Sequence, residues 1–173
     1  MDQKKLEQAA RLIIEAVGED PEREGLLETP RRFAEMVAEQ LAYAAVPNEE
    51  IARAFDKTFS SPESDMVVVK DISLFSHCEH HIAIMYNMKA AVGYIPRGRV
   101  IGLSKIARIA DAVSKRLQIQ ERIGADIRDI MERITGAGDV IVLLEGEHSC
   151  MTARGIRKPG TLTRTISASG RFR

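Results

Sequence analysis

The sequence predicts an α+β protein, with an N-terminal helical segment at residues 1–65 and an antiparallel-sheet domain at residues 66–173. Up to Leu41, apolar side chains recur at helical spacing. From Met66 onward, short apolar runs rich in β-branched residues are bounded by turn residues. Two such runs precede a long helical stretch and two follow it. This order predicts a four-stranded antiparallel sheet with two packed helices.

The N-terminal segment contains two predicted helices and a loop. The first helix is indicated by a helical repeat of apolar residues and ends at Gly18; the repeat comprises Leu6, Ala9, Ala10, Ile13, Ile14 and Val17. Thr29 and Pro30 resemble an N-cap followed by proline at the first helical position, which predicts a second helix. Residues 46–65 are rich in proline and serine, so we expect a loop that includes a helical turn.

The remaining elements follow in chain order. We expect strands at "MVVVKDISLF" (66–75) and "MKAAVGYIP" (88–96), with a hairpin turn near residues 85–89. Ser104 should cap a helix that runs to about Leu117, and "QERIGADIRDIMERI" (120–134) continues or restarts it until Gly136. The last two strands are expected at "DVIVLLEGEH" (139–148) and "TLTRTISAS" (161–169).

Composition excludes several classes of protein. Hydrophobic residues make up 45% and charged residues 29% of the chain, and the net charge is zero. This balance is typical of a soluble globular protein and gives no general attraction to nucleic acid or to an anionic membrane. No apolar run is long enough to cross a membrane, and the N-terminus is amphipathic rather than signal-like, so we expect a cytoplasmic protein.

The histidines and cysteines cluster. All four histidines lie within three positions of one of the two cysteines: His77, His80 and His81 near Cys78, and His148 near Cys150. A turn can bring residues i and i+3 onto one ion, so Cys78 and His81 can bind zinc together and Cys150 can complete three protein ligands. Three ligands leave a fourth position open to water, as in catalytic zinc sites. The alternative is a closed structural site with His80 or His148 as the fourth ligand.

Two histidines are left over beside this ligand set. His80 and His148 have side chains that titrate near neutral pH, which suits proton transfer. A metal-activated water flanked by two acid–base groups indicates hydrolysis at an electrophilic carbon.

Several motifs together resemble the GTP cyclohydrolase I family. They stand in the family's order between about Leu12 and Phe172 and are "ETPRRFAEM", "CEHH", "GYIP", "IGLSKIARI", "RLQIQERI" and "EHSCMTARGIRKPG". The resemblance implies that GTP and water give 7,8-dihydroneopterin triphosphate and formate, the entry to folate and other pterins. It implies zinc ligation by Cys78, His81 and Cys150, and proton transfer by His80 and His148.

The same resemblance assigns the substrate-binding residues. Glu121 is implied to accept two hydrogen bonds from guanine, with Gln120 as a second base-binding residue. Ser104, Lys105 and Arg108 begin a helix whose free N–H groups favour phosphate, and Ser104 is also counted with the catalytic set. Two further cations, Arg154 and Arg32, are implied to bind the triphosphate.

The resemblance also implies an assembly. Members of the family have the tunnel-forming fold, and two pentameric rings stack into a homodecamer whose active sites draw on neighbouring subunits. Two alternatives belong to other classes: a zinc-stapled oligomeric protein without this activity, and a deazapurine nitrile reductase of the same fold. Two features depart from the family pattern, namely the hairpin at 85–89 and His77, for which we expect no required role.

Overall fold

The computed structural model describes residues 1–173 and divides into two compact units, Met1–Ala42 and Tyr43–Arg173. The first unit is a pair of packed helices, α1 (Gln3–Ala16) and α2 (Thr29–Gln40). The side chain of Asp2 caps α1 by accepting a hydrogen bond from the backbone N–H of Lys5 at 3.1 Å. The predicted N-cap of α2 is wrong by one residue, because Glu28 takes that position and Thr29 is already helical.

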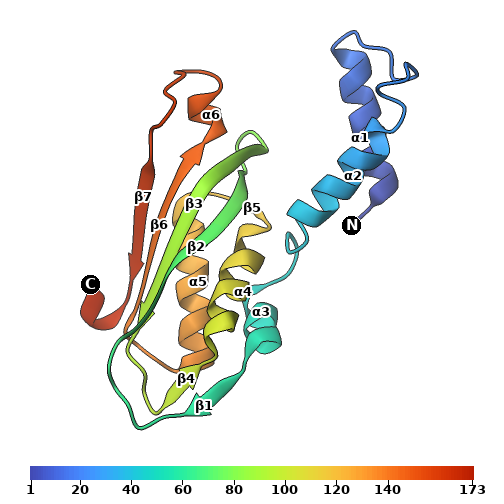
Figure 1. Ribbon diagram of the computed structural model, residues 1–173. Helices are drawn as coiled ribbons and strands as arrows, with labels where there is room; N and C mark the ends of the chain where they lie inside the picture. The colour runs from blue at the N-terminus through green and yellow to red at the C-terminus, as the bar shows by residue number, and fades with distance from the viewer. The chain divides into compact units, whose positions relative to one another are not determined.

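The second unit carries the sheet (Figure 1). Its elements, in chain order, are α3 (Asn48–Phe55), β1 (Thr58–Ser60), β2 (Val67–Cys78), β3 (Ala83–Tyr94), β4 (Arg99–Ile101), α4 (Leu103–Ser114), β5 (Leu117–Gln118), α5 (Gln120–Thr135), β6 (Val140–His148), α6 (Ser149–Thr152), β7 (Thr163–Ala168) and a terminal 3-10 turn (Gly170–Phe172). Thus α3 and β1, which fall within the segment 1–65, belong to the second unit.

The fold is a mixed α+β arrangement, but its main sheet has five strands rather than the four we expected. The strand order is β5-β2-β3-β6-β7. Four of these strands are antiparallel neighbours, whereas β5 is a two-residue strand that pairs parallel to the end of β2. A separate two-stranded ribbon joins β1 to β4. Strand β5 could not be predicted from the sequence, because two residues are too few for a periodic pattern.

The predicted hairpin turn at residues 85–89 is wrong. Strand β2 continues to Cys78 and β3 begins at Ala83, so the turn lies at residues 79–82. Residues 85–89 are inside β3, where the register with β6 shifts between Tyr86 and Lys89 and Asn87 has φ of 50°. Asparagine tolerates this left-handed conformation, and the result is a bulge rather than a turn.

Helices α4 and α5 pack on one face of the main sheet (Figure 1). Many of their apolar side chains are fully buried, among them Ile106, Ile109, Val113, Ile123, Ile127 and Ile130. As predicted, Gly136 ends α5 in a left-handed conformation. The predicted cap of α4 is wrong, because Gly102 precedes the helix and Ser104 lies inside its first turn. No helix in the structure is both long and apolar enough to cross a membrane.

A close approach between β3 and β6 gives a test of this packing. A Cβ added to Gly146 would lie 2.7 Å from Cγ of Met88, whose side chain is buried. Gly146→Ala should therefore destabilise the protein by about 1–3 kcal/mol, although alanine is otherwise the better residue in a strand. In denaturant unfolding, Met88→Ala combined with Gly146→Ala should cost less than the sum of the two single changes. Additive costs would show that Met88 is not the obstacle.

Candidate metal centre and adjoining pocket

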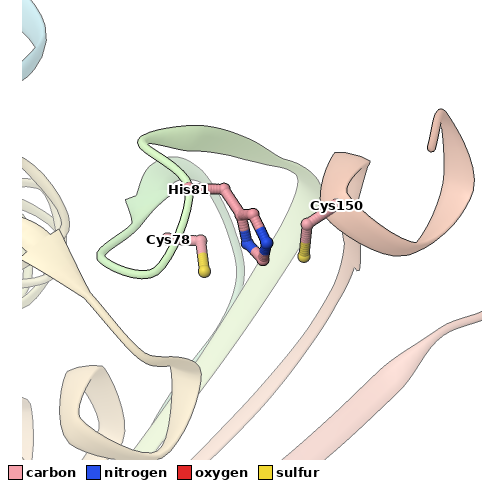
Figure 2. A group of neighbouring side chains, drawn as sticks. All are labelled: Cys78, His81 and Cys150. Atoms are coloured by element: carbon pink, nitrogen blue, oxygen red, sulfur yellow. The ribbon is translucent and has the colours of Figure 1, made fainter. Parts of the chain in front are cut away.

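The candidate ligands meet where β2 and β6 end, on either side of β3. Cys78 is the last residue of β2 and pairs with Ala83, while His148 ends β6 and pairs with Met85. The turn after β2 carries His81, and α6 follows β6 directly with Cys150. The side chains of Cys78, His81 and Cys150 point toward a common centre, and their ligand atoms lie within 4.8 Å of one another (Figure 2).

The donor set fits a divalent metal such as zinc. Both cysteines are free thiols, and two thiolates with one imidazole are ligands that zinc prefers. Burial raises the pKa of the Cys150 thiol, and the neighbouring Cys78 thiol raises this pKa further. Two adjacent thiolates are thus unfavourable without a cation between them, and a bound divalent cation would remove that penalty.

Arg154 lies beside the same centre. Its Nη1 donates a hydrogen bond to Nε2 of His81 at 3.0 Å. The resemblance had assigned Arg154 to the triphosphate, and the structure places its guanidinium at the edge of the candidate metal centre. An anion bound by Arg154 would therefore lie next to that centre.

His148 is held by Gln120 from the start of α5. The amide Nε2 of Gln120 donates hydrogen bonds to the carbonyls of Leu144 and Thr163 at 3.3 and 2.9 Å. Its Oε1 must then accept, so Nε2 of His148, 2.9 Å away, is the donor. The lone pair of the neutral ring is consequently on Nδ1. Burial lowers the pKa of His148, and the charge of Glu121 partly opposes this shift.

A cavity of about 250 Å³ adjoins the candidate metal centre. Residues that we predicted from the sequence form much of its lining: Cys78, His80, Gln120, Glu121, His148 and Cys150. The side chain of His80 is exposed, and its Nδ1 lies 3.6 Å from Sγ of Cys78. Glu121 is also exposed, in the first turn of α5. The cavity thus combines candidate ligands, two histidines and one carboxylate.

Three predicted phosphate-binding residues lie elsewhere in the same unit. The C-terminal end of α4 is on the side of the pocket, because Ser76, which pairs with the pocket residue Met85, donates through Oγ to the carbonyl of Ser114 at 2.7 Å. Ser104, Lys105 and Arg108 belong to the opposite half of α4, a 12-residue helix that spans about 18 Å. The ammonium of Lys105 lies over the ring of Phe55, 5.7 Å from its centroid. One chain therefore does not gather these cations at its own pocket.

Two other residues considered in the sequence analysis are not members of the group of three. Arg32 is an exposed residue of α2 in the first unit, and its assignment to the triphosphate stays a prediction. His77 is buried in β2, where Nδ1 has no hydrogen-bond partner and the ring lies edge-to-face with Phe75 at 6.5 Å.

Sequence reasoning missed the polar contacts that hold α6. The hydroxyl of Tyr86 lies 2.9 Å from Oγ1 of Thr152 and donates to Glu147 at 3.3 Å. Glu147 also accepts hydrogen bonds from Asn87 and from the backbone of Gly160, at 2.9 and 3.2 Å. These contacts fix the short helix that carries Cys150. The bulge at Asn87 brings polar side chains of β3 and β6 together. A bulge interrupts the alternating pattern of a strand, so it could not be predicted from sequence periodicity.

The fold and the site first define a class: an α+β protein in which two cysteines and one histidine could hold a metal ion beside a pocket lined by two histidines and a carboxylate. The sequence profile of GTP cyclohydrolase I then matches residues 6–173. The chain is 55% identical to "GTP cyclohydrolase 1" of Clostridium acetobutylicum, covering 100% of this chain and 91% of the relative. The relative of the same name from Clostridium beijerinckii is 54% identical, covering 99% and 90%. The chain belongs to the GTP cyclohydrolase I family.

Among solved structures, the archaeosine synthase QueF-Like in the apo form aligns with a TM-score of 0.49 and 18% identity. The alignment covers 64% of this chain and 96% of that one.

The geometry predicts different outcomes for two adjacent histidines. His81→Ala should abolish stable metal binding, because it removes one of three ligands. His80→Ala should retain about one metal ion per chain, since His80 lies outside the group. Metal content after gel filtration, measured by atomic absorption, distinguishes the two variants. Loss of metal from His80→Ala together with retention in His81→Ala would reverse the assignment.

Proposed function

We propose that the protein is a zinc-dependent hydrolase that opens the imidazole ring of GTP, giving 7,8-dihydroneopterin triphosphate and formate. The observation that carries the proposal is the position of the Cys78, His81 and Cys150 group beside the pocket lined by His80 and His148. Family membership over residues 6–173 supports the same substrate. The product would enter the biosynthesis of folate and other pterins.

Zinc is the metal that this ligand set favours. Cys78, His81 and Cys150 would hold it, since thiolate and imidazole donors together select zinc over magnesium or calcium. When bound, zinc supplies a Lewis acid that activates water at neutral pH. His80 and His148 then remain as acid–base groups, which favours a catalytic site over a closed structural one.

Glu121 is proposed to recognise guanine. Its carboxylate is exposed at the pocket, so it is free to accept hydrogen bonds from N1–H and the exocyclic amine of guanine. Gln120 has a different proposed role from the one the resemblance implied. Because its amide is fully engaged with β6, β7 and His148, it orients His148 rather than contacting the base through that amide.

The two histidines are proposed to move protons on the pocket side. His148 presents Nδ1 as the basic atom, and its lowered pKa keeps it neutral and able to accept a proton near neutral pH. His80 is exposed and lies beside Cys78, so it can exchange protons with both solvent and a bound substrate. Formyl hydrolysis and ring rearrangement both need such transfers.

The triphosphate is proposed to be bound by more than one subunit. Arg154 lies beside the candidate metal centre of its own chain, whereas Ser104, Lys105 and Arg108 lie toward the far end of α4. A neighbouring subunit can supply Ser104 and the two cations if subunits join as rings of the tunnel-forming fold. We therefore propose a homo-oligomer, with a decamer of two pentameric rings as the form implied by the family.

Replacing Glu121 tests the substrate assignment. Glu121→Gln should raise KM for GTP about 10–100-fold, because one amide group cannot accept both guanine hydrogen bonds. Folding should be unaffected, since the side chain is exposed. Glu132→Gln is a matched control, because Glu132 lies on the same helix and pairs with Arg128 instead of lining the pocket. Unchanged KM in Glu121→Gln, measured by formate release, would remove Glu121 from guanine binding.

Shared active sites predict complementation between inactive variants. His80→Ala keeps the α4 cations, and the double variant Lys105→Ala/Arg108→Ala keeps the pocket. Each alone should have little activity, but mixed oligomers should regain up to about a quarter of wild-type turnover, because some interfaces combine two intact halves. Mixed oligomers that form and stay inactive would contradict a site shared between subunits.

A further inference from the structure

The segment between α4 and α5 carries part of the pocket. Residues 116–122, which we call the connector, include Gln120 and Glu121. Strand β5 within the connector runs parallel to the end of β2, with Cys78 opposite Gln118. The connector therefore lies beside the turn at residues 78–82 that carries the candidate ligands. The distance and orientation between the candidate metal ligands and the pocket residues depend on how the connector and this turn are held together.

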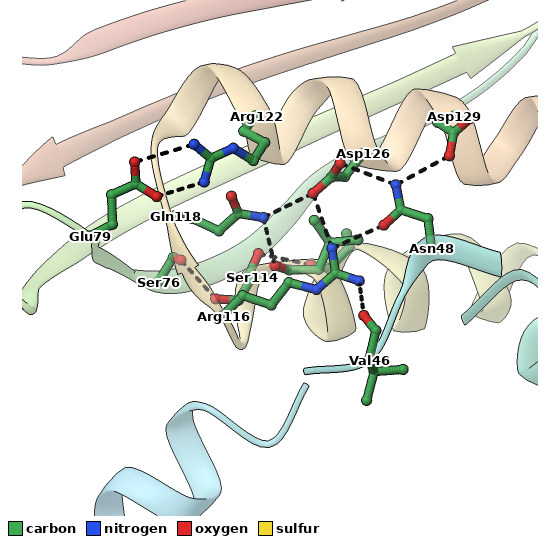
Figure 3. A network of polar contacts seen from close by, with 12 residues as sticks. Val46, Asn48, Ser76, Glu79, Ser114, Arg116, Gln118, Arg122, Asp126 and Asp129 are labelled. Carbon is green, nitrogen blue, oxygen red and sulfur yellow. Dashed lines mark hydrogen bonds and ion pairs between the residues drawn. The ribbon is translucent and has the colours of Figure 1, made fainter. Parts of the chain in front are cut away.

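The connector is fixed to the helices by a largely buried network around Asp126 (Figure 3). Oδ2 of Asp126 accepts hydrogen bonds from Arg116 at 3.1 Å and from Gln118 at 3.0 Å. Arg116 also donates to Asn48 at 2.9 Å and to the carbonyl of Val46 at 2.6 Å. The side chains of Arg116 and Asp126 are only 12% and 18% exposed. This end of the connector is thus rigidly held on α5 and α3.

The 78–82 turn is fixed to the connector by Glu79. The backbone N–H of Glu79 donates to the carbonyl of Gln118 at 3.0 Å. Its carboxylate accepts two hydrogen bonds from the guanidinium of Arg122, at 2.6 and 3.2 Å. This paired arrangement fixes orientation as well as distance. Glu79 lies between Cys78 and His80, and Arg122 follows Glu121. The ion pair therefore joins the ligand turn to the proposed guanine-binding residue.

We propose that Glu79 is a positioning residue, which acts through Arg122 to hold the 78–82 turn in register with the guanine-binding start of α5. The inference rests on the proposed function. The pair is partly exposed, at 34% and 46% for Glu79 and Arg122, so it contributes little to global stability. Its effect is on geometry, where a shift of about 1 Å can cost on the order of a hundredfold in rate.

A double-mutant cycle tests the pair in the zinc-loaded protein. Glu79→Ala and Arg122→Ala should each lower kcat for GTP about tenfold or more, with KM changed less than about twofold, because each binding element remains intact. The double variant should be no worse than either single variant, since both remove the same contact. Melting temperatures should change little. Independent, multiplicative losses, or a loss confined to thermal stability, would overturn the proposal.

Arg133→Ala is the matched control. Arg133 lies on the same helix, has 44% side-chain exposure and pairs with Asp129 at 2.8 Å, but it does not line the pocket. It should retain wild-type kcat. An equal loss of kcat in Arg133→Ala would mean that any surface pair of α5 has this effect, which would overturn the specific role of Glu79.

A second readout is independent of GTP turnover. Zinc release to an excess of chelator should be several-fold faster from Glu79→Ala and Arg122→Ala than from wild type or Arg133→Ala, because the ligand turn is less constrained. This comparison keeps its meaning even if the wild-type protein fails to turn over GTP, so failure of the proposed function and failure of this inference are distinguishable. Equal release rates in all four proteins would overturn the positioning role.

Discussion

The placement of two cysteine thiols and one imidazole within 4.8 Å of one another is the constraint on which the rest of the site depends. The ligands come from two distant parts of the chain, and only the alignment of the ends of β2 and β6 across β3 brings them together. Burial raises the pKa of the Cys150 thiol, and the neighbouring Cys78 thiol raises it further, so two adjacent thiolates are unfavourable without a cation. Metal binding and the shape of this end of the sheet are therefore coupled.

Different polar contacts hold different parts of the candidate site in place. The side-chain amide of Gln120 orients His148 through a hydrogen bond. Tyr86 and Glu147 hold the short helix that carries Cys150. Asp126 of α5 holds the connector by accepting hydrogen bonds from Arg116 and Gln118. These contacts leave the pocket side of the histidines and Glu121 free for a ligand. The cations of α4 are absent from this arrangement, which is consistent with a site completed by another subunit.

Much of the candidate site could be predicted from local spacing, because the i+3 relation of Cys78 and His81 is a property of one turn. The partnership with Cys150 followed from residue type and from the family resemblance. Spacing could not reveal β5, since a two-residue strand has no period, nor the bulge at Asn87, which looked like a turn. The hydrogen bonds from Gln120 to β6 and β7 could not be predicted either. They depend on two backbone carbonyls that come close to Gln120 only after the sheet has formed.

The most direct test of the account is the product balance of GTP turnover by zinc-loaded and chelator-treated protein. We predict that the loaded protein releases one formate for each 7,8-dihydroneopterin triphosphate, detected as fluorescent neopterin after oxidation and dephosphorylation. Chelation should stop formation of both products, and added zinc should restore them together. Turnover that is undiminished in fully metal-free protein, or a zinc-loaded and assembled protein that yields neither product, would contradict the account.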